Sequence, residues 1–246
     1  MVLELPYNQE NWRRFSLSSM NQVVRTLLAP SPEITRMTSV RRYTSLFSQD
    51  QDAHSLFVID DGLVKLTRTN DDGNHIILAM CGSGDIVGEE ALGGASSKYA
   101  ADAEVISPSN LYRIPRETLA HLVHQDSGFA QQLIQFLLLR RQTYAKKVEL
   151  LCFNDVKYRI LFYLVELTSL VRPEPGSTGC HVPITQAELA NLVGATRETT
   201  STALNQLERR GLVQLSRRLL TIPSPSLLRS VASQVFETHA TSARAS

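Results

Sequence analysis

The chain has 246 residues, of which 43% are hydrophobic and 20% charged, and its formal net charge is +1. This length allows two domains with separate cores, and the composition is that of an ordinary soluble protein. The apolar runs are too short for a membrane span, and the first residues lack the apolar core of a signal peptide. We therefore expect a cytoplasmic protein with no membrane partner.

The three cysteines are Cys81, Cys152 and Cys180. They are too few and too scattered for a disulfide framework or a zinc site. We expect reduced thiols, no bound metal and no cofactor.

Residues 34–126 are predicted to form an antiparallel β-roll, preceded by an N-terminal extension over 1–33. Short β-forming runs alternate with turn clusters such as Asp60-Asp61-Gly62. Asp-Gly pairs favour hairpins because glycine adopts positive φ without steric cost. Regularly spaced units of this kind are typical of a barrel or jelly roll. The expected strands are Leu56–Ile59, Leu63–Thr67, His75–Met80, Glu104–Ile106 and Leu111–Ile114.

Residues 127–154 are predicted to form one long helix. An apolar stripe recurs along it at spacings of three, four and seven residues. The stripe either packs against the β-roll or pairs with the same helix of a second chain. We favour pairing into a homodimer. The residues of the stripe are Leu133, Leu137, Tyr144, Val148 and Leu151.

Residues 155–228 are predicted to form a second domain, with a tail over 229–246. After an apolar helix at 156–171 and a loop at 172–181, the run Thr185-Gln186-Ala187-Glu188 is a capping box that opens a short helix. Gly194 supplies a tight turn, and Thr196 caps a second helix that begins near Arg197. This order is that of a helix-turn-helix.

The second of these helices has two different faces at 100° per residue. Its inward face holds Thr200, Ala203, Leu204 and Leu207. Its polar face suits DNA, because arginine bonds guanine, glutamate accepts from cytosine, and short hydroxyls bond phosphates. The candidate DNA contacts are Thr185, Gln186, Thr196, Arg197, Glu198, Thr199, Ser201, Thr202, Asn205, Arg217 and Arg218.

A β-wing is predicted directly after the second helix. Gly211–Leu215 and Leu219–Ile222 are two short strands around Arg217 and Arg218, which are placed to contact phosphates. Residues 155–246 carry 10 Lys+Arg against 7 Asp+Glu, a small excess that suits a polyanionic partner.

These segments resemble the cyclic-AMP receptor protein / fumarate–nitrate reduction regulator (CRP/FNR) family of bacterial transcription regulators over about residues 34–228. The strongest portion is ITQAELANLVGATRETTSTALNQLERRGLV, and IDDGLVKLTRTNDDGNHIILAMCGSGDIVGEEAL is similar to the family's β-roll. The resemblance implies an α+β protein with an N-terminal β-roll (jelly roll), a long dimerisation helix and a C-terminal winged helix-turn-helix.

The family resemblance also implies the function and the partners. The implied function is regulation of transcription by binding a palindromic operator in double-stranded DNA. The implied partners are a second copy of the chain, paired through residues 127–154, and RNA polymerase, for which the loop 172–181 is a candidate contact. An enzyme is not expected, because the sequence contains no His-x-His, G-x-S-x-G or H-E-x-x-H motif.

The effector pocket departs from the family pattern. In cyclic-AMP binders a Gly-Glu pair binds the ribose and a later Arg-Ser pair binds the phosphate. Gly88 and Glu89 match the first pair, but Tyr99 and Ala100 stand at the second, and Tyr144 replaces a threonine that meets the base. A phosphate beside Glu89 without a cation would bind poorly. We therefore expect no control by cyclic AMP.

Two alternatives remain for this pocket. Either it binds a different small molecule that gates the regulator, or the tyrosines fill it and the protein is competent without an effector. We favour the second.

The recognition helix also departs from the family pattern at one position. Arg197 and Glu198 are kept, but Thr202 stands where cyclic-AMP-type members carry a second arginine one turn later. Threonine cannot make a bidentate contact to guanine. We expect a related palindrome that is read differently at that base pair.

Overall fold

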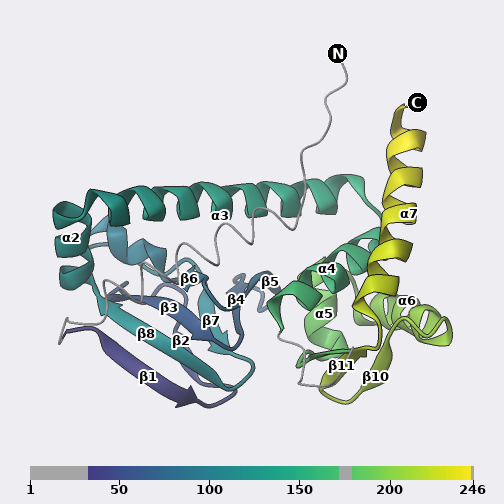
Figure 1. Ribbon diagram of the computed structural model, residues 1–246, viewed down its shortest axis with the longest axis horizontal. Helices are drawn as coiled ribbons and strands as arrows, with labels where there is room; N and C mark the ends of the chain where they lie inside the picture. Colours follow the sequence, from purple (N-terminus) through teal and green to yellow (C-terminus); the bar gives the residue numbers. More distant parts are fainter. Residues whose placement is uncertain (1–32, 172–178, 245–246) are drawn as a thin grey trace.

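The computed structural model describes residues 33–171 and 179–244 (Figure 1). Apart from its last residue, the expected N-terminal extension lies outside these ranges, as do residues 172–178 of the expected loop. The fold is α+β: a β-roll, a long helix and a smaller C-terminal part, as the sequence predicts.

The β-roll consists of two four-stranded antiparallel sheets around one apolar core. The five strands expected from the sequence are present, each within a few residues of the predicted bounds. Three further strands were not expected: β1 (Thr35–Val40), β2 (Ser45–Phe47) and β6 (Ile86–Val87). One sheet has the order β1 (Thr35–Val40), β8 (Ser109–Pro115), β3 (Ser55–Asp61), β6 (Ile86–Val87), and the other β2 (Ser45–Phe47), β7 (Asp102–Val105), β4 (Val64–Thr69), β5 (His75–Cys81).

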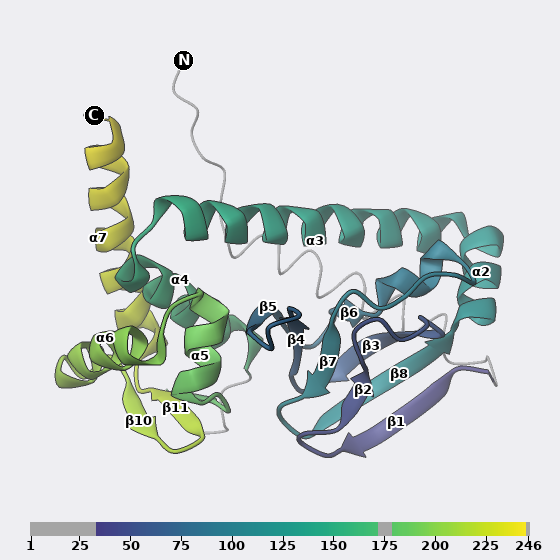
Figure 2. The ribbon, with the colours of Figure 1, turned by 180° about the vertical axis from the view of Figure 1, so that it is seen from behind.

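Two helices follow the roll: α2 (Arg116–Gln125), which the sequence analysis missed, and α3 (Ser127–Phe153). The predicted long helix is confirmed. It begins where the Asp126 side chain accepts a hydrogen bond from the backbone N–H of Phe129. Both ribbon views show α3 running across the roll and on toward the C-terminal part (Figures 1 and 2).

The apolar stripe predicted on α3 mostly faces the β-roll. Leu133 is buried in the roll's core, and Leu137 and Tyr144 pack against it, so packing on the roll accounts for these residues. An apolar row lies on the exposed side: Ile134, Leu138 and Val148 are 58%, 51% and 60% exposed. Of these, Val148 belongs to the predicted stripe. The surface available for pairing therefore lies about a quarter-turn around the helix from the predicted one.

The C-terminal part is a winged helix. Its sheet has the order β10-β11-β9, in which β9 was not expected. Its elements are α4 (Val156–Leu170), β9 (Cys180–Val182), α5 (Gln186–Val193), α6 (Arg197–Arg209), β10 (Gln214–Ser216), β11 (Leu219–Ile222) and α7 (Pro225–Arg244).

The described residues of the predicted C-terminal tail over 229–246 are helical, because α7 continues to Arg244. Leu228 and Ala232 are buried, and Val235 and Phe236 pack against the same core. This spacing gives α7 an apolar face that covers α4.

A second apolar core lies in the winged helix and includes residues of the β-roll. Leu63, Ile77, Met80 and Ile106 of the roll are buried in the same cluster as the helix-turn-helix residues, and α5 lies against β5. The winged helix is thus docked on the roll.

Candidate nucleic-acid interface and effector pocket

The helix-turn-helix begins with the predicted capping box. Thr185 Oγ1 accepts from the backbone N–H of Glu188 at 3.1 Å, and Glu188 Oε2 accepts from the Thr185 N–H at 2.9 Å. These reciprocal bonds satisfy two backbone donors at the start of α5. Gln186 is the first residue of the helix and is partly exposed.

The turn between α5 and α6 depends on Gly194. Its φ of 65° and ψ of 50° are in the left-handed region. This conformation is unfavourable for a residue with a side chain, but glycine adopts it freely. Thr196 then caps α6, because its Oγ1 accepts from the backbone N–H of Thr199 at 3.2 Å. The Thr199 hydroxyl lies 2.9 Å from that of Thr196, so both hydroxyls take part in the cap.

The two faces of α6 are those predicted from its sequence. The inward face, made of Thr200, Ala203, Leu204 and Leu207, is buried. The opposite face is polar and open to a partner, with Ser201 partly buried at its edge. Its exposed residues are Arg197, Glu198, Thr202, Asn205 and Arg209.

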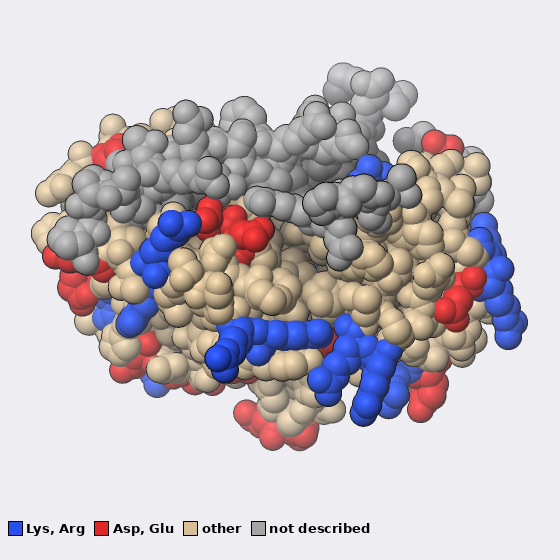
Figure 3. All heavy atoms as spheres, turned by 60° about the horizontal axis from the view of Figure 1, so that its bottom comes forward, with Lys and Arg blue, Asp and Glu red and all other residues tan. Residues whose placement is uncertain are grey.

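The wing is present and carries its two arginines at the tip. Arg217 and Arg218 are exposed in the turn between β10 and β11. The Arg218 guanidinium also lies 5.9 Å from the ring centre of Tyr43 in the β-roll. Figure 3 shows basic side chains gathered on this side of the molecule. A phosphate backbone passing the wing would meet positive charge.

Tyr99, which the sequence analysis expects at the phosphate-binding position of the effector pocket, is buried. Its side chain is 3% exposed, and its ring stacks on Phe47 with centres 3.8 Å apart. The Tyr99 hydroxyl accepts from the Ser55 N–H at 3.0 Å and donates to the Ser55 carbonyl at 2.8 Å. Both capacities of the hydroxyl are used within the protein.

The backbone around Gly88 leaves no room for a side chain. Its φ is 81°, and a Cβ there would lie 2.8 Å from the Ser55 carbonyl oxygen and 3.0 Å from Tyr99 Cε1. Gly88 precedes the short 3-10 helix η1 (Glu89–Gly93). The glycine thus allows Tyr99 to pack directly against the backbone.

Ala100 is exposed, and its methyl side chain has no group that can form a hydrogen bond, so only its backbone can do so. Its N–H donates to Glu90 Oε1 at 3.1 Å. Burial, with a smaller contribution from Glu89, raises the pKa of Glu90. Sequence reasoning missed Glu90, which is next to the predicted Glu89 and binds the Ala100 N–H.

Arg140 of α3 is a second residue that sequence reasoning missed. It is 8% exposed; it donates to the Ile86 carbonyl at 2.6 Å and to Cys81 Sγ at 3.2 Å, and its Nε lies 3.8 Å from Glu89 Oε1. Tyr144 lies one turn further along α3, and burial raises its pKa to about 12. The site therefore has a buried cation facing the carboxylate of Glu89.

Two family models match the chain: the cyclic nucleotide-binding domain over residues 37–126 and the Crp-like helix-turn-helix domain over 158–231. The chain belongs to the CRP/FNR family of transcription regulators. It is therefore a DNA-binding transcription regulator, in a family that is not enzymatic.

The chain is similar to regulators whose names describe different signals. The chain is 27% identical to the cyclic AMP receptor protein of Thermus thermophilus over 187 residues, covering 76% of this chain and 83% of that protein. It is 23% identical to the anaerobic regulatory protein of Bacillus subtilis over 184 residues, covering 74% and 77%. The c-di-GMP responsive regulator CLP of Xanthomonas campestris has the same fold, with a TM-score of 0.66 at 24% identity, covering 82% and 98% of the two chains.

Within residues 33–171 and 179–244, no helix is both long and apolar enough to cross a membrane. The same residues contain no group of three or more side chains placed to hold a metal ion.

Proposed function

We propose that this CRP/FNR regulator binds a palindromic operator as a homodimer and does not require cyclic AMP. The observation that carries the proposal is the polar face of α6. Arg197, Glu198 and Thr202 are exposed on it, while the opposite face is fixed in the core. A helix held in this way presents its N-terminal residues to the major groove, and Arg217 and Arg218 flank it for phosphate contacts.

The exposed row on α3 supports pairing of two copies. Ile134, Leu138, Ala145 and Val148, together with Arg141 and Cys152, follow alternating steps of four and three residues, and all six are exposed. This is the spacing of a coiled-coil seam. A two-fold axis along α3 would present two α6 helices in opposite directions, which matches a palindrome.

The Tyr99 contacts support independence from cyclic AMP. A cyclic phosphate needs a cation. The matching position holds a buried phenol whose hydroxyl is already bonded to Ser55, and the buried cation Arg140 already faces the carboxylate of Glu89. To admit a nucleotide, the ring would have to leave Phe47 and break both of these hydrogen bonds. We infer that the Tyr99 side chain occupies the space in the roll that a nucleotide would need.

A second candidate is a regulator gated by a different small molecule, and Arg140 favours it. A guanidinium that is 8% exposed and 3.8 Å from Glu89 is a ready partner for an anionic group. A ligand of this kind would compete with Glu89 for Arg140. Isothermal titration with cyclic AMP, cyclic GMP and 2-oxoglutarate separates the candidates.

For the first candidate we expect no heat of binding with any of the three compounds. Saturable binding of cyclic AMP would contradict it, and binding of another compound that also shifts DNA affinity would favour the second.

In a salt series from about 50 to 200 mM, the dissociation constant for DNA should rise steeply, since phosphate contacts release counterions. We further expect contact with RNA polymerase and, because the partner is chromosomal DNA, a cytoplasmic location.

A further inference from the structure

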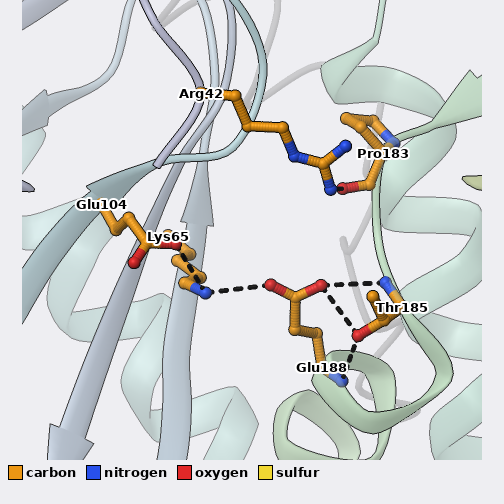
Figure 4. A network of polar contacts seen from close by, with 6 residues as sticks. All are labelled: Arg42, Lys65, Glu104, Pro183, Thr185 and Glu188. Carbon is orange, nitrogen blue, oxygen red and sulfur yellow. Dashed lines mark hydrogen bonds and ion pairs between the residues drawn. The ribbon is translucent and has the colours of Figure 1, made fainter. Parts of the chain in front are cut away.

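The first helix of the helix-turn-helix is held at its N-terminal end by the β-roll. Lys65 Nζ of β4 lies 2.9 Å from Glu188 Oε1 in the first turn of α5 (Figure 4). The other carboxylate oxygen of Glu188 accepts from Thr185. One glutamate therefore both caps α5 and ties it to the roll.

The same lysine makes a second ion pair inside the roll. Lys65 Nζ lies 2.9 Å from Glu104 Oε1 on β7, directly across the strand pair. Burial acts to raise the pKa of Glu188, but the bonds from Thr185 and Lys65 outweigh burial, and the pKa is lowered. Burial acts to lower the pKa of Lys65, but the bonds to Glu188 and Glu104 raise it. Both shifts favour the charged forms. Each of the two side chains is only 17% exposed, which limits screening by solvent.

The C-terminal end of α5 is held by the dimerisation helix. Lys147 of α3 is 6% exposed, and its Nζ donates to the Leu192 carbonyl at 2.7 Å. Beside the N-terminal end, Arg42 of the roll donates to the Pro183 carbonyl at 2.9 Å. Side chains of the roll and of α3 thus contact both ends of α5 and the segment that leads into it.

The apolar contacts between the roll and α5 do not by themselves fix a direction. Burial of Ile77 and Met80 is favourable in many orientations, because hydrophobic attraction is non-directional. Hydrogen bonds and ion pairs at the ends of a helix depend on distance and angle. The contacts of Lys65, Arg42 and Lys147 therefore favour one orientation of α5 on the roll.

We propose that Lys65 is a positioning residue that fixes, through Glu188, the orientation of the two recognition helices and thereby the spacing of the half-sites that the dimer accepts. This inference rests on the proposed function as a homodimer on a palindrome. The α5 helix has 8 residues and is about 12 Å long. α6 begins beside the Lys147 end of α5 and packs on α5, so a tilt of α5 turns α6 through the same angle. The 13 residues of α6 span about 20 Å, and a tilt of about 15° moves its far end by about 5 Å, more than the ~3.4 Å rise of one base pair.

The test uses the full-length protein and a set of duplexes with identical half-sites. The spacer between the half-sites is shortened by one base pair, kept, or lengthened by one or two. The wild-type dissociation constant should have one sharp minimum along the series. In Glu188→Gln the minimum should flatten, with the ratio between the best spacer and its neighbours falling about tenfold, equivalent to about 1.4 kcal/mol.

Glu188→Gln is suitable because glutamine retains the capping-box contact but loses the charge that Lys65 binds. Lys65→Gln tests the same pair while leaving the cap untouched, and serves if the first variant folds poorly. Glu104→Gln is the matched control: it removes an ion pair of equal length to the same lysine, but one that stays inside the roll. It should keep the wild-type spacing profile.

An unchanged profile in both Glu188→Gln and Lys65→Gln would overturn the inference while leaving the proposed function intact. An equally flattened profile in Glu104→Gln would also overturn it, because the effect would then be that of a lost charge anywhere on the roll. Failure of the wild-type protein to prefer any palindromic duplex would refute the proposed function, and this inference with it.

Discussion

Thr202 lies on the exposed face of α6, one helical turn after Glu198. Its hydroxyl can make one hydrogen bond to a base edge or a phosphate, whereas an arginine there could hold guanine with two. Arg197 and Glu198 in the first turn of the helix remain available for base edges. Under the proposed function, we therefore expect the residue at 202 to set which base pair is read weakly.

The substitution Thr202→Arg should give the helix a new base preference. We expect one base pair in each half-site to shift toward guanine, with about 1–3 kcal/mol of discrimination against other bases. Competition binding with single-base operator variants measures this. Gln206→Arg adds the same charge one turn further from the N-terminus and should raise affinity for all sequences. Identical base preferences in wild type and Thr202→Arg would contradict the assignment.

The role of a residue could be predicted from the sequence where it depends only on neighbours along the chain. The inward position of Thr200 and the cap by Thr196 follow from helix periodicity and turn chemistry, and the structure has both. Arg140 was not predictable, because its partners Cys81 and Ile86 come from other elements of the fold. Its neighbour in sequence, Arg141, is exposed, and nothing local distinguishes the two.

At the scale of elements, α3 has two roles on two sides. One side completes the core of the β-roll through Phe129, Leu133 and Phe136. The other exposes the Ile134–Leu138–Val148 row. Apolar spacing alone predicted a stripe but could not tell which apolar side chains the roll would cover, because that depends on how the helix is docked.

The exposed row on α3 yields a prediction about assembly. Leu138→Glu places a charge in the centre of the proposed seam, so two copies would bury like charges, and the protein should become monomeric at micromolar concentration. Sedimentation equilibrium measures the change. Gln135→Glu adds the same charge at the edge of this surface and should remain dimeric. A dimeric Leu138→Glu, or a monomeric wild type, would contradict the role given to α3.

The contact between α3 and α5 should depend on pH through Lys147. Burial, with repulsion from Arg159, lowers the pKa of Lys147 from 10.5 to about 8, and the other titratable group beside it is Tyr163. Between pH 8 and 10.5 the unfolded chain therefore binds more protons at this residue than the folded one. Its contribution to the free energy of unfolding should rise with pH in that window, by at most about 1.4 kcal/mol per unit.

Urea unfolding of wild type and Lys147→Met at pH 7, 8, 9 and 10 tests this expectation. The stability of the wild type relative to the variant should be constant below about pH 8 and grow above it. Lys146→Met, which removes a lysine paired with Glu149, is the control. A relative stability that falls with rising pH, or the same growth in both variants, would contradict the buried position of Lys147.

At the scale of the whole molecule, sequence order predicted the succession of roll, helix and winged helix. It did not predict how the parts are joined. Lys65 and Glu188 are 123 residues apart in sequence, and Leu63, Ile77, Met80 and Ile106 of the roll belong to the second core although their sequence neighbours Val64, Ala79, Cys81 and Val105 belong to the first. The docking of the winged helix on β5 is a property of the assembled fold. It turns two separately recognisable domains into one unit.

The central claim is that this regulator reads a palindrome as a dimer without cyclic AMP. Its most direct test is selection of bound duplexes from a random library by the purified full-length protein, with and without cyclic AMP. We predict the same enriched motif in both, with two inverted half-sites about one helical turn apart, centre to centre. Enrichment only with cyclic AMP, or a motif with a single half-site, would contradict the account.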